Sequence, residues 1–249
     1  MANLKEIRNR ISSVSSTMQI TSAMKMVSAA KLKKAQDAIT AMRPYADKLT
    51  ELLQNLSASL EGDSGSVYAD NRFVNKVLIV SITSNRGFLG KRFNVIANHS
   101  GVYDDLTFDN VAEIAESLMK LFTNGDYDRI EIVYNKFKNA ATQIVMTEQF
   151  LPIVPLEVEG NVSADYTFEP SKIEIIEQLI PKSLKTQLYK GIRDSFASEH
   201  GARMTAMHKA TDNATEMRDQ LKLTYNKARQ ASITNEILEI VGGAEALNN

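Results

Sequence analysis

The feature that most constrains this chain of 249 residues is a long apolar repeat at each end. Between residues 4 and 60, alternating spacings of three and four define 17 positions, of which 14 are apolar. Residues 207–238 keep the same spacing, with 8 of 10 positions apolar. Such a repeat is typical of helices that pair along a coiled-coil seam. Both ends of the chain are therefore predicted to be helical and to need a helical partner.

The first repeat is interrupted by polar residues at three consecutive seam positions. These positions are occupied by Thr21, Lys25 and Ser28. Around them the apolar residues lie off the series, at Ile20, Ala23, Met24 and Val27. We interpret this as a slip in the phase of the coiled coil near residues 20–28, with the apolar face moved to the second set.

Proline and glycine residues indicate where the helices are disturbed or end. Pro44 lies inside the first helix, where a proline normally kinks or breaks the chain. Gly62 and Gly65 are expected to end that helix. The last helical stripe runs from Pro181, which suits a first helical turn. The glycine pair at 242–243 is the expected end of the last helix, although the helix can continue beyond it with frayed turns.

Helix length limits how these segments can be arranged. At 1.5 Å per residue, helices of this size are ~90–100 Å long. A globule of this many residues has a radius of gyration near ~18 Å. The two helices are therefore expected to pair with each other, antiparallel, and to project as a rod.

The middle of the chain has a different periodicity. Val74–Thr83 is a β-rich apolar run, and Ile130–Phe137 and Gln143–Phe150 alternate, with an amphipathic helix over 111–122 between the first two. Strand, helix, strand is the order of an α/β unit. The expected fold class is α/β with long helices, in which a coiled coil carries a small Rossmann-like domain. The expected parts are 1–62 (N-terminal helix), 70–170 (α/β domain) and 171–249 (C-terminal helical segment).

Composition excludes several classes of protein. Hydrophobic residues make up 43% of the chain and charged residues 24%, as in a soluble folded protein. No stretch approaches the ~18 apolar residues of a spanning helix. The absence of cysteine excludes disulfides, thiol nucleophiles and cysteine metal sites. The N-terminus lacks the apolar core of a signal peptide, so a bacterial-type cytoplasm is expected.

Charge is distributed unevenly along the chain. Residues 1–60 carry 9 basic and 4 acidic groups, whereas residues 61–180 carry 10 and 18. The densest basic cluster comprises Lys25, Lys31, Lys33 and Lys34, with no acidic residue between positions 6 and 37. Three interpretations stay open: a solvated helix face, a nucleic-acid surface, and a contact with an acidic protein partner. The nucleic-acid interpretation is weakened because no aromatic residues interleave the lysines.

No catalytic constellation is apparent. The three histidines are scattered and are expected to be single surface residues. The loop Thr83–Gly90 follows a strand, as phosphate-binding loops do, but it has neither the dinucleotide-binding nor the P-loop glycine pattern. We therefore expect no cofactor, no metal and no active site, which leaves a mechanical or scaffolding role.

Several motifs resemble one family closely. LKEIRNRISSVSSTMQITSAMKMVSAAKLKKAQ near the start and ARMTAMHKATDNATEMRDQLKLTYNKARQASITNEILEIVGGAEAL near the end are similar to the gamma subunits of F-type ATP synthases. SNRGFLG, YDRIEIVYNKF and DYTFEPS in the middle match as well. The resemblance covers nearly the whole chain, and the C-terminal block is the most specific part.

The resemblance implies a non-catalytic rotor subunit of the central stalk. In that family the terminal helices form a coiled coil inside a ring of three alpha and three beta subunits. The α/β domain forms a foot on the membrane ring of c subunits and binds the epsilon subunit. The resemblance also implies a peripheral position on the cytoplasmic face of the bacterial membrane, with no transmembrane segment and no nucleic acid bound.

The resemblance further implies which residues contact partners. Met24 and Lys25, with the lysines at 31, 33 and 34, would face acidic loops of the beta subunits. The segment around Tyr166, Phe168 and Glu169 would approach the polar loops of the c-ring. Near the C-terminus, Arg229 and Gln230 lie outside the seam and face outward. Their guanidinium and amide groups would suit a loop of one beta subunit. Two further partner-contact residues are expected at Arg203 and Thr234.

The sequence departs from the family pattern around residue 90. The family's turn is usually Ser-Asp-Arg-Gly-Leu-Cys-Gly, whereas Asn85, Phe88 and Leu89 differ here. Beyond Gly90, some tens of residues that family members carry, about a helix and a strand, are missing. Either the foot domain is trimmed or a disordered segment is absent from the sequence. The second alternative is favoured, because losing the helix would uncover one face of the sheet.

Two other functions remain as alternatives. One is a coiled-coil scaffold or tether without energy coupling, whose C-terminus would not have to fit inside a surrounding ring of subunits. The other is a small nucleotide-binding α/β enzyme with helical arms, which requires that the purified chain bind a nucleotide tightly. The composition of the native complex discriminates among all three.

Overall fold

The computed structural model describes residues 4–58, 67–68, 72–83, 94–153 and 172–247. The chain divides into two compact units. The first comprises residues 1–30 and 202–249, and the second comprises residues 31–201. Helices α1 and α3 each contribute one part to each unit. The expected division at residues 62, 70 and 171 stays a prediction.

Helix α1 spans Leu4–Ala58 as one helix, as the apolar repeat predicts. Pro44 lies inside it and does not end it. Within the second unit, α1 buries its seam residues, with Ala35 1% and Ile39 3% exposed. Burial of this stripe offsets the ~3 kcal/mol that an interior proline costs. The glycines expected to end the helix lie outside the described residues.

Helix α3 spans Lys172–Leu247 and continues past the glycine pair at 242–243. The prediction that its stripe starts with Pro181 in a first turn is wrong, because Pro181 lies inside the helix. The turns before Pro181 are held by tertiary packing: Ile180 is 7% exposed, and Ile175 and Leu179 pack against the same core. Each such side chain contributes ~1.5–3 kcal/mol on burial, which compensates for the missing backbone donor.

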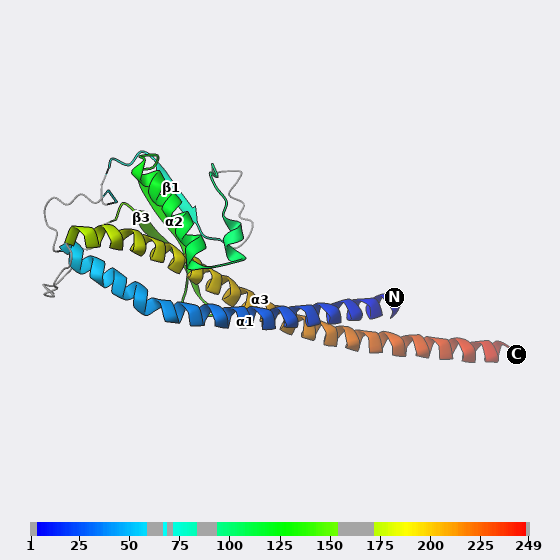
Figure 1. Ribbon diagram of the computed structural model, residues 1–249. Coiled ribbons are helices and arrows are strands. Elements are labelled where there is room, and N and C mark those ends of the chain that lie inside the picture. The colour runs from blue at the N-terminus through cyan, green and yellow to red at the C-terminus, as the bar shows by residue number, and fades with distance from the viewer. Residues whose placement is uncertain (1–3, 59–66, 69–71, 84–93, 154–171, 248–249) are drawn as a thin grey trace. The chain divides into compact units, whose positions relative to one another are not determined.

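In the first unit, α1 and α3 pair in antiparallel fashion (Figure 1). Arg8 contacts Tyr225, Met18 contacts Thr215, and Thr21 contacts Thr211, so residue numbers rise on one helix as they fall on the other. The predicted phase slip near 20–28 is wrong. Thr21 is 9% and Ser28 2% exposed, so the polar residues stay in the seam. Small side chains with hydrogen-bonding hydroxyls fit where the helices approach closely.

The seam of α3 also differs from the prediction. Ala214 is buried and Ala228 half-buried, as expected, but Met217 is 54% exposed. The other inward positions on this side of α3 include Thr211, Arg218, Tyr225 and Ser232. The predicted spacing of three and four over 207–238 also places residues 217, 224, 231 and 235 in the seam, but these four lie outward. Polar side chains occupy the inward positions because each of the first three has a partner on α1.

The second unit contains a three-stranded sheet in the order β1-β2-β3. The strands are β1 (Val77–Ser81), β2 (Arg129–Phe137) and β3 (Gln143–Leu151). β1 is parallel to β2, and β3 is antiparallel to it. Helix α2 (Phe108–Thr123) connects the parallel strands, and its N-terminus is capped by Thr107, which accepts from the Asn110 amide. These elements agree with the predicted strand, helix, strand order.

One face of the sheet holds the core of the second unit. Phe122 from α2, Ile130 from β2 and Leu188 from α3 are each at most 1% exposed. Both α2 and the first part of α3 pack on this face. Serine hydroxyls join α3 to the sheet, since Ser195 donates to the Ile82 carbonyl and Ser198 to that of Asn135. These contacts place α3 directly beside the ends of β1 and β2.

A carboxyl group is buried in this unit. Asp194 is 2% exposed, and its Oδ1 has no hydrogen-bond partner in the described part of the chain. Burial raises the pKa of Asp194, and the nearby Glu148 charge acts in the same direction. The charges of Arg43, Lys190 and Lys136 act in the opposite direction without overcoming the burial. The ionised form of Asp194 is therefore destabilised in the folded protein.

Asp194→Asn is expected to raise the free energy of unfolding at pH 7 by about 1 kcal/mol, because an amide avoids the cost of a buried charge. A group whose folded pKa is raised stabilises the fold at pH values below its unfolded pKa. That stability is lost as pH rises through the folded pKa. Urea unfolding between pH 4 and pH 8 should therefore show a decline in the wild type that the variant lacks. Asp126→Asn, at an exposed position, is the control; equal profiles for wild type and Asp194→Asn would contradict the assignment.

Candidate functional site

The candidate site is the outward surface of the long helices. Among the described residues, no group of three or more His, Asp or Glu is placed to hold a metal ion. None of the described helices combines the length and apolar character needed to cross a bilayer. Most of the partner-contact residues expected from the sequence are side chains of α1 and α3.

The N-terminal part of α1 presents an apolar surface. In the first unit, Ile20 is 60%, Met24 41%, Met26 66% and Val27 57% exposed. These side chains face away from α3 because the small residues at 21 and 28 occupy the seam. Lys25 is half-buried beside them. An exposed apolar patch with adjacent positive charge fits a protein partner better than water.

The basic cluster continues along α1 into the second unit. Lys31, Lys33 and Lys34 are exposed and have no hydrogen bond or ion pair with any described residue. Neighbouring Leu32 is 5% exposed and belongs to the seam. The three ammonium groups are thus free to meet an acidic surface.

Residues 233–244 of α3 are exposed on all sides. Beyond the contact between Tyr225 and Arg8, α3 extends past the beginning of α1 (Figure 1). Arg229 and Gln230 are exposed, as predicted, and Thr234 donates to the Gln230 carbonyl at 2.9 Å. Apolar side chains also face outward here, with exposures of 47–71%: Ile233, Ile237, Leu238, Ile240 and Val241.

The remaining predicted residues divide into two groups. Arg203 is half-buried and already has a polar or electrostatic contact within the chain, so it is not a free outward group. Tyr166, Phe168 and Glu169 lie outside the described residues, as does the SNRGFLG loop. Of the histidines, His99 and His208 are exposed as expected. The expectation is wrong for His200, which is 5% exposed and packs edge-on against Phe196.

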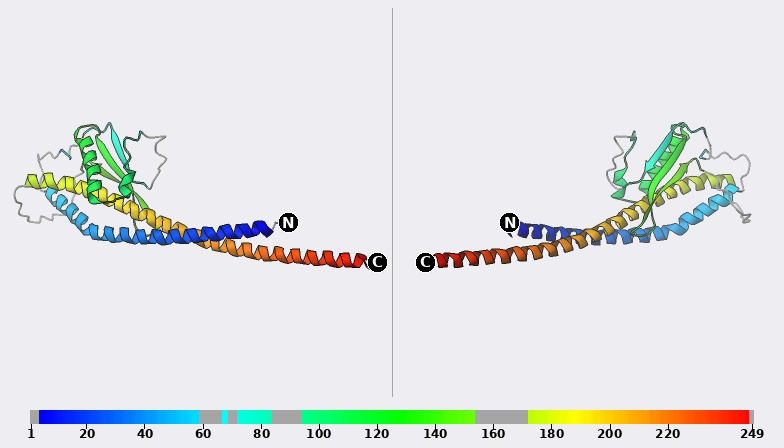
Figure 2. Two further views of the ribbon diagram at one scale, coloured as in Figure 1. Left: turned by 45° about the vertical axis from the view of Figure 1, so that its right-hand side comes forward. Right: turned by 180° about the vertical axis from the view of Figure 1, so that it is seen from behind.

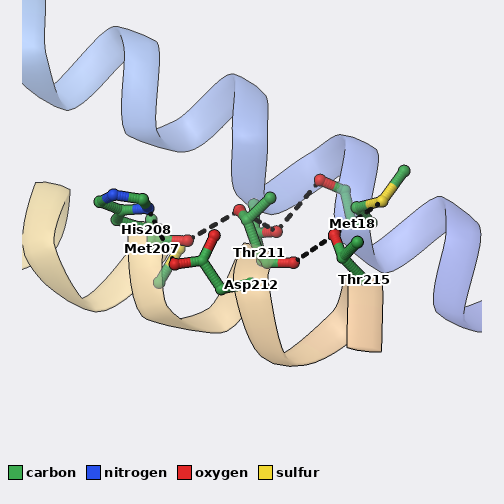
Figure 3. Close-up of polar contacts among 7 residues, drawn as sticks. Met18, Met207, His208, Thr211, Asp212 and Thr215 are labelled. Carbon is green, nitrogen blue, oxygen red and sulfur yellow. Dashed lines mark hydrogen bonds and ion pairs between the residues drawn. The ribbon is translucent and has the colours of Figure 1, made fainter. Parts of the chain in front are cut away.

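A polar seam joins α1 and α3 inside the first unit (Figure 3). Thr211 donates to Thr21 Oγ1 at 2.8 Å and lies 2.8 Å from the Met207 carbonyl. One turn on, Thr215 contacts Met18 Sδ at 3.4 Å. The signal was present, because Thr21 and Ser28 stand at seam positions, but it was interpreted as a slip.

A second polar contact lies further along the same pair of helices. The Arg8 guanidinium donates to the Tyr225 hydroxyl at 2.7 Å and lies 5.7 Å from the centre of its ring. This hydrogen bond raises the pKa of Arg8 above its ordinary value. Polar contacts therefore join α1 to residues 211, 215, 218 and 225 of α3.

Removing only one hydroxyl of the threonine pair should destabilise the first unit, whereas removing both should not. Thr211→Val is expected to cost about 1 kcal/mol in free energy of unfolding, because the Thr21 oxygen loses its donor from α3 in a partly buried seam and Thr21 keeps only its own bond to the Met18 carbonyl. Adding Thr21→Val should recover that loss, since two apolar side chains then face each other. Urea unfolding of the two single variants and the double variant measures the coupling. Strictly additive losses would contradict the hydrogen bond.

The fold is shared with chains of known ATP synthase structures. A chain from the Euglena gracilis mitochondrial ATP synthase (OSCP/F1/c-ring, rotational state 3) superposes with a TM-score of 0.66 at 20% identity. The superposition covers 98% of this chain and 94% of that one. A chain from the rotor of the same enzyme gives a TM-score of 0.59 at 19% identity, covering 92% and 98%. At these identities the likeness concerns the fold alone.

Sequence comparison identifies the family. A family model described as ATP synthase matches residues 3–99 and 89–247. The chain is 67% identical to the ATP synthase gamma chain of Flavobacterium johnsoniae, with all of both proteins covered. It is 50% identical to the gamma chain of Cytophaga hutchinsonii, again over the full length of both. The chain belongs to the ATP synthase gamma chain family.

The comparisons also locate a difference in length. The alignment with the Flavobacterium johnsoniae gamma chain has 285 positions, whereas this chain has 249 residues, so 36 positions have no residue here. The two matched ranges of the family model overlap at residues 89–99. The match to the family model is therefore interrupted shortly after the end of β1, where the family turn departs from its usual pattern.

Proposed function

We propose that this chain is the central-stalk rotor subunit of an F-type ATP synthase. It would transmit rotation between a proton-driven c-ring and a catalytic hexamer of alpha and beta subunits. Membership of the gamma chain family supports this role, since the relatives match over their full length. The structural observation that best supports a rotating shaft is the exposed apolar C-terminal end of α3.

A solvent-exposed helix with apolar residues on several sides is unfavourable in water. Five large apolar side chains of residues 233–241 are 47–71% exposed. Full burial of such a side chain contributes ~1.5–3 kcal/mol, and each of these forgoes part of that free energy as long as it stays in water. A surrounding sleeve of protein recovers that free energy, and a rotating shaft needs such a sleeve at its tip. A free scaffold or tether has no need of it.

The charged groups suggest how the shaft meets its surroundings. Lys31, Lys33 and Lys34 suit acidic loops of the beta subunits, and Arg229 with Gln230 suits carboxylate and backbone partners. Tyr166, Phe168 and Glu169 are proposed to meet the polar loops of the c-ring, and the α/β domain to bind the epsilon subunit. One copy would assemble with three alpha and three beta subunits. The chain would supply no catalytic residue and would lie peripherally at the cytoplasmic face of the membrane.

Composition of the native complex tests this role directly. Affinity purification of the tagged chain from its own cells should recover alpha, beta and gamma in a ratio of three to three to one, by quantitative mass spectrometry. Recovery of the chain alone, or with unrelated proteins, would leave only the scaffold interpretation. Calorimetry of the purified chain with ATP and ADP should show no binding; tight binding would favour the enzyme alternative.

Reversing the charge of Lys31, Lys33 and Lys34 to Glu is expected to reduce ATP-driven proton pumping by about threefold or more, since repulsion replaces attraction at a moving contact. Assembly should change less, because the apolar seam beneath the lysines is untouched. Fluorescence quenching in inverted vesicles measures pumping. The control reverses three exposed lysines elsewhere in the second unit: Lys120, Lys138 and Lys182. Unaltered pumping by the first variant would refute the contact.

Arg229→Ala combined with Gln230→Ala should slow ATP hydrolysis by the assembled complex, up to about tenfold. A charge-assisted hydrogen bond shielded from water contributes ~1.5–3 kcal/mol. Because rotation breaks and remakes this bond, its loss should affect turnover or assembly yield and leave the helicity of the isolated subunit unchanged by circular dichroism. Asn213→Ala, at an exposed position on the same helix, serves as the control. Normal turnover and yield in the double variant would remove this assignment.

A further inference from the structure

The contact between Arg8 and Tyr225 lies near the start of α1. That helix begins at Leu4, whereas α3 continues for 22 residues beyond Tyr225, to residue 247. In both views of Figure 2, α3 runs on past the start of α1. Of the interhelical polar contacts already described, this one lies closest along α3 to Arg229 and Gln230. How α3 is held at Tyr225 therefore affects the direction in which those two side chains point.

The geometry of this contact restrains rotation of α3 about its own axis. Nη2 of Arg8 donates to the Tyr225 hydroxyl at 2.7 Å, and the guanidinium carbon lies 5.7 Å from the centre of the ring. Apolar contacts along a seam are non-directional, so they resist separation of the helices more than rotation. A hydrogen bond has a preferred distance and angle, and the contact with the ring restrains the same side chain a second time. The neighbouring Ile7 is 5% exposed, so the turn of α1 that carries Arg8 is itself packed in place.

The angle of α3 at Tyr225 sets where Arg229 and Gln230, the outward pair, are directed. These residues follow Tyr225 by four and five positions on the same helix, and both are exposed. They therefore lie about 40° and about 140° around the helix axis from Tyr225. Groups that bind a partner must be held within about 10–20° of their working direction. A larger rotation of α3 would carry the outward pair away from its partner.

We propose that Arg8 is a positioning residue, which acts through Tyr225 to fix the angle at which α3 presents Arg229 and Gln230 to a protein partner. The guanidinium of Arg8 needs no contact with that partner. Inside a surrounding sleeve of protein, where the dielectric constant is lower than in water, its hydrogen bond to Tyr225 becomes stronger. The effect on turnover rests on the proposed rotor function, whereas the restraint on α3 is a property of this chain alone.

Spin labels measure the restraint in the full chain, which has no natural cysteine. The labels are attached to Ser16→Cys on α1 and Lys227→Cys on α3, two exposed positions of the first unit. Arg8→Ala removes both contacts with the ring, and Tyr225→Phe removes only the hydroxyl. In Arg8→Ala we expect the distribution of distances between the labels to broaden by about half or more, because no directional bond then limits the angle of α3.

Arg10→Ala is the matched control, since Arg10 forms its ion pair with Glu6 of the same helix. Its distance distribution should equal that of the parent chain. An unchanged distribution in Arg8→Ala, with helicity preserved by circular dichroism, would overturn the proposal. If Arg8→Ala loses helicity, Tyr225→Phe decides in its place, because it removes one oxygen and keeps the ring. A broadened distribution then supports the restraint, and an unchanged one overturns it.

Turnover of the assembled complex tests whether Arg8 acts through the outward pair. Arg8→Ala should slow ATP hydrolysis by about threefold or more, because the pair is then held less accurately. Added to Arg229→Ala with Gln230→Ala, it should slow hydrolysis no further, whereas a merely structural residue would add a loss of its own. Strictly additive losses, or normal turnover in Arg8→Ala when the double variant is slow, would overturn the positioning role. Normal turnover in the double variant would remove the partner contact of the proposed function, while a broadened distance distribution would still support the restraint by Arg8.

Discussion

Close approach of α1 to α3 in the first unit depends on small side chains where the two helices meet. Ser28 is 2%, Ala214 8% and Thr21 9% exposed. A continuous seam of Ile and Leu would hold the helices further apart and leave no room for the Thr211 to Thr21 hydrogen bond. Because small residues occupy the seam, the larger apolar residues of this stretch point outward. The apolar surface available to partners is therefore a consequence of the small residues in the seam.

Small residues also allow close contact where α3 crosses the sheet of the second unit. A Cβ at Gly201 would lie 3.2 Å from the backbone of Ala140, and one at Gly191 would lie 3.4 Å from Ile82. Ser195 and Ser198 approach the strand ends closely enough to donate to backbone carbonyls. Small and hydroxyl-bearing residues thus let α3 serve two roles along its length. It pairs with α1 in one unit and completes the core in the other.

Much of the fold could be predicted because long periodic patterns depend on local geometry. The repeat of three and four identifies α1 and α3 whatever surrounds them, and alternation identifies β2 and β3. Details that depend on neighbours were predicted poorly. Pro181 resembled a helix start, and only the packing of Ile180 and the residues before it explains why α3 begins at Lys172. His200 resembled a surface residue until Phe196 was placed against it.

The sequence by itself determined the long helices, the α/β order between them, the family and the outward position of Arg229 and Gln230, because these follow from periodicity and extended identity. Only the tertiary structure decided which side of each helix is the seam. Polar Thr21 and Ser28 can stay inside because hydroxyl partners and close approach compensate for their lost hydration, and no periodicity reports that compensation. The exposure of Val77 and Ile79 on β1 was likewise decided in three dimensions, since burial depends on which helix lies against each strand.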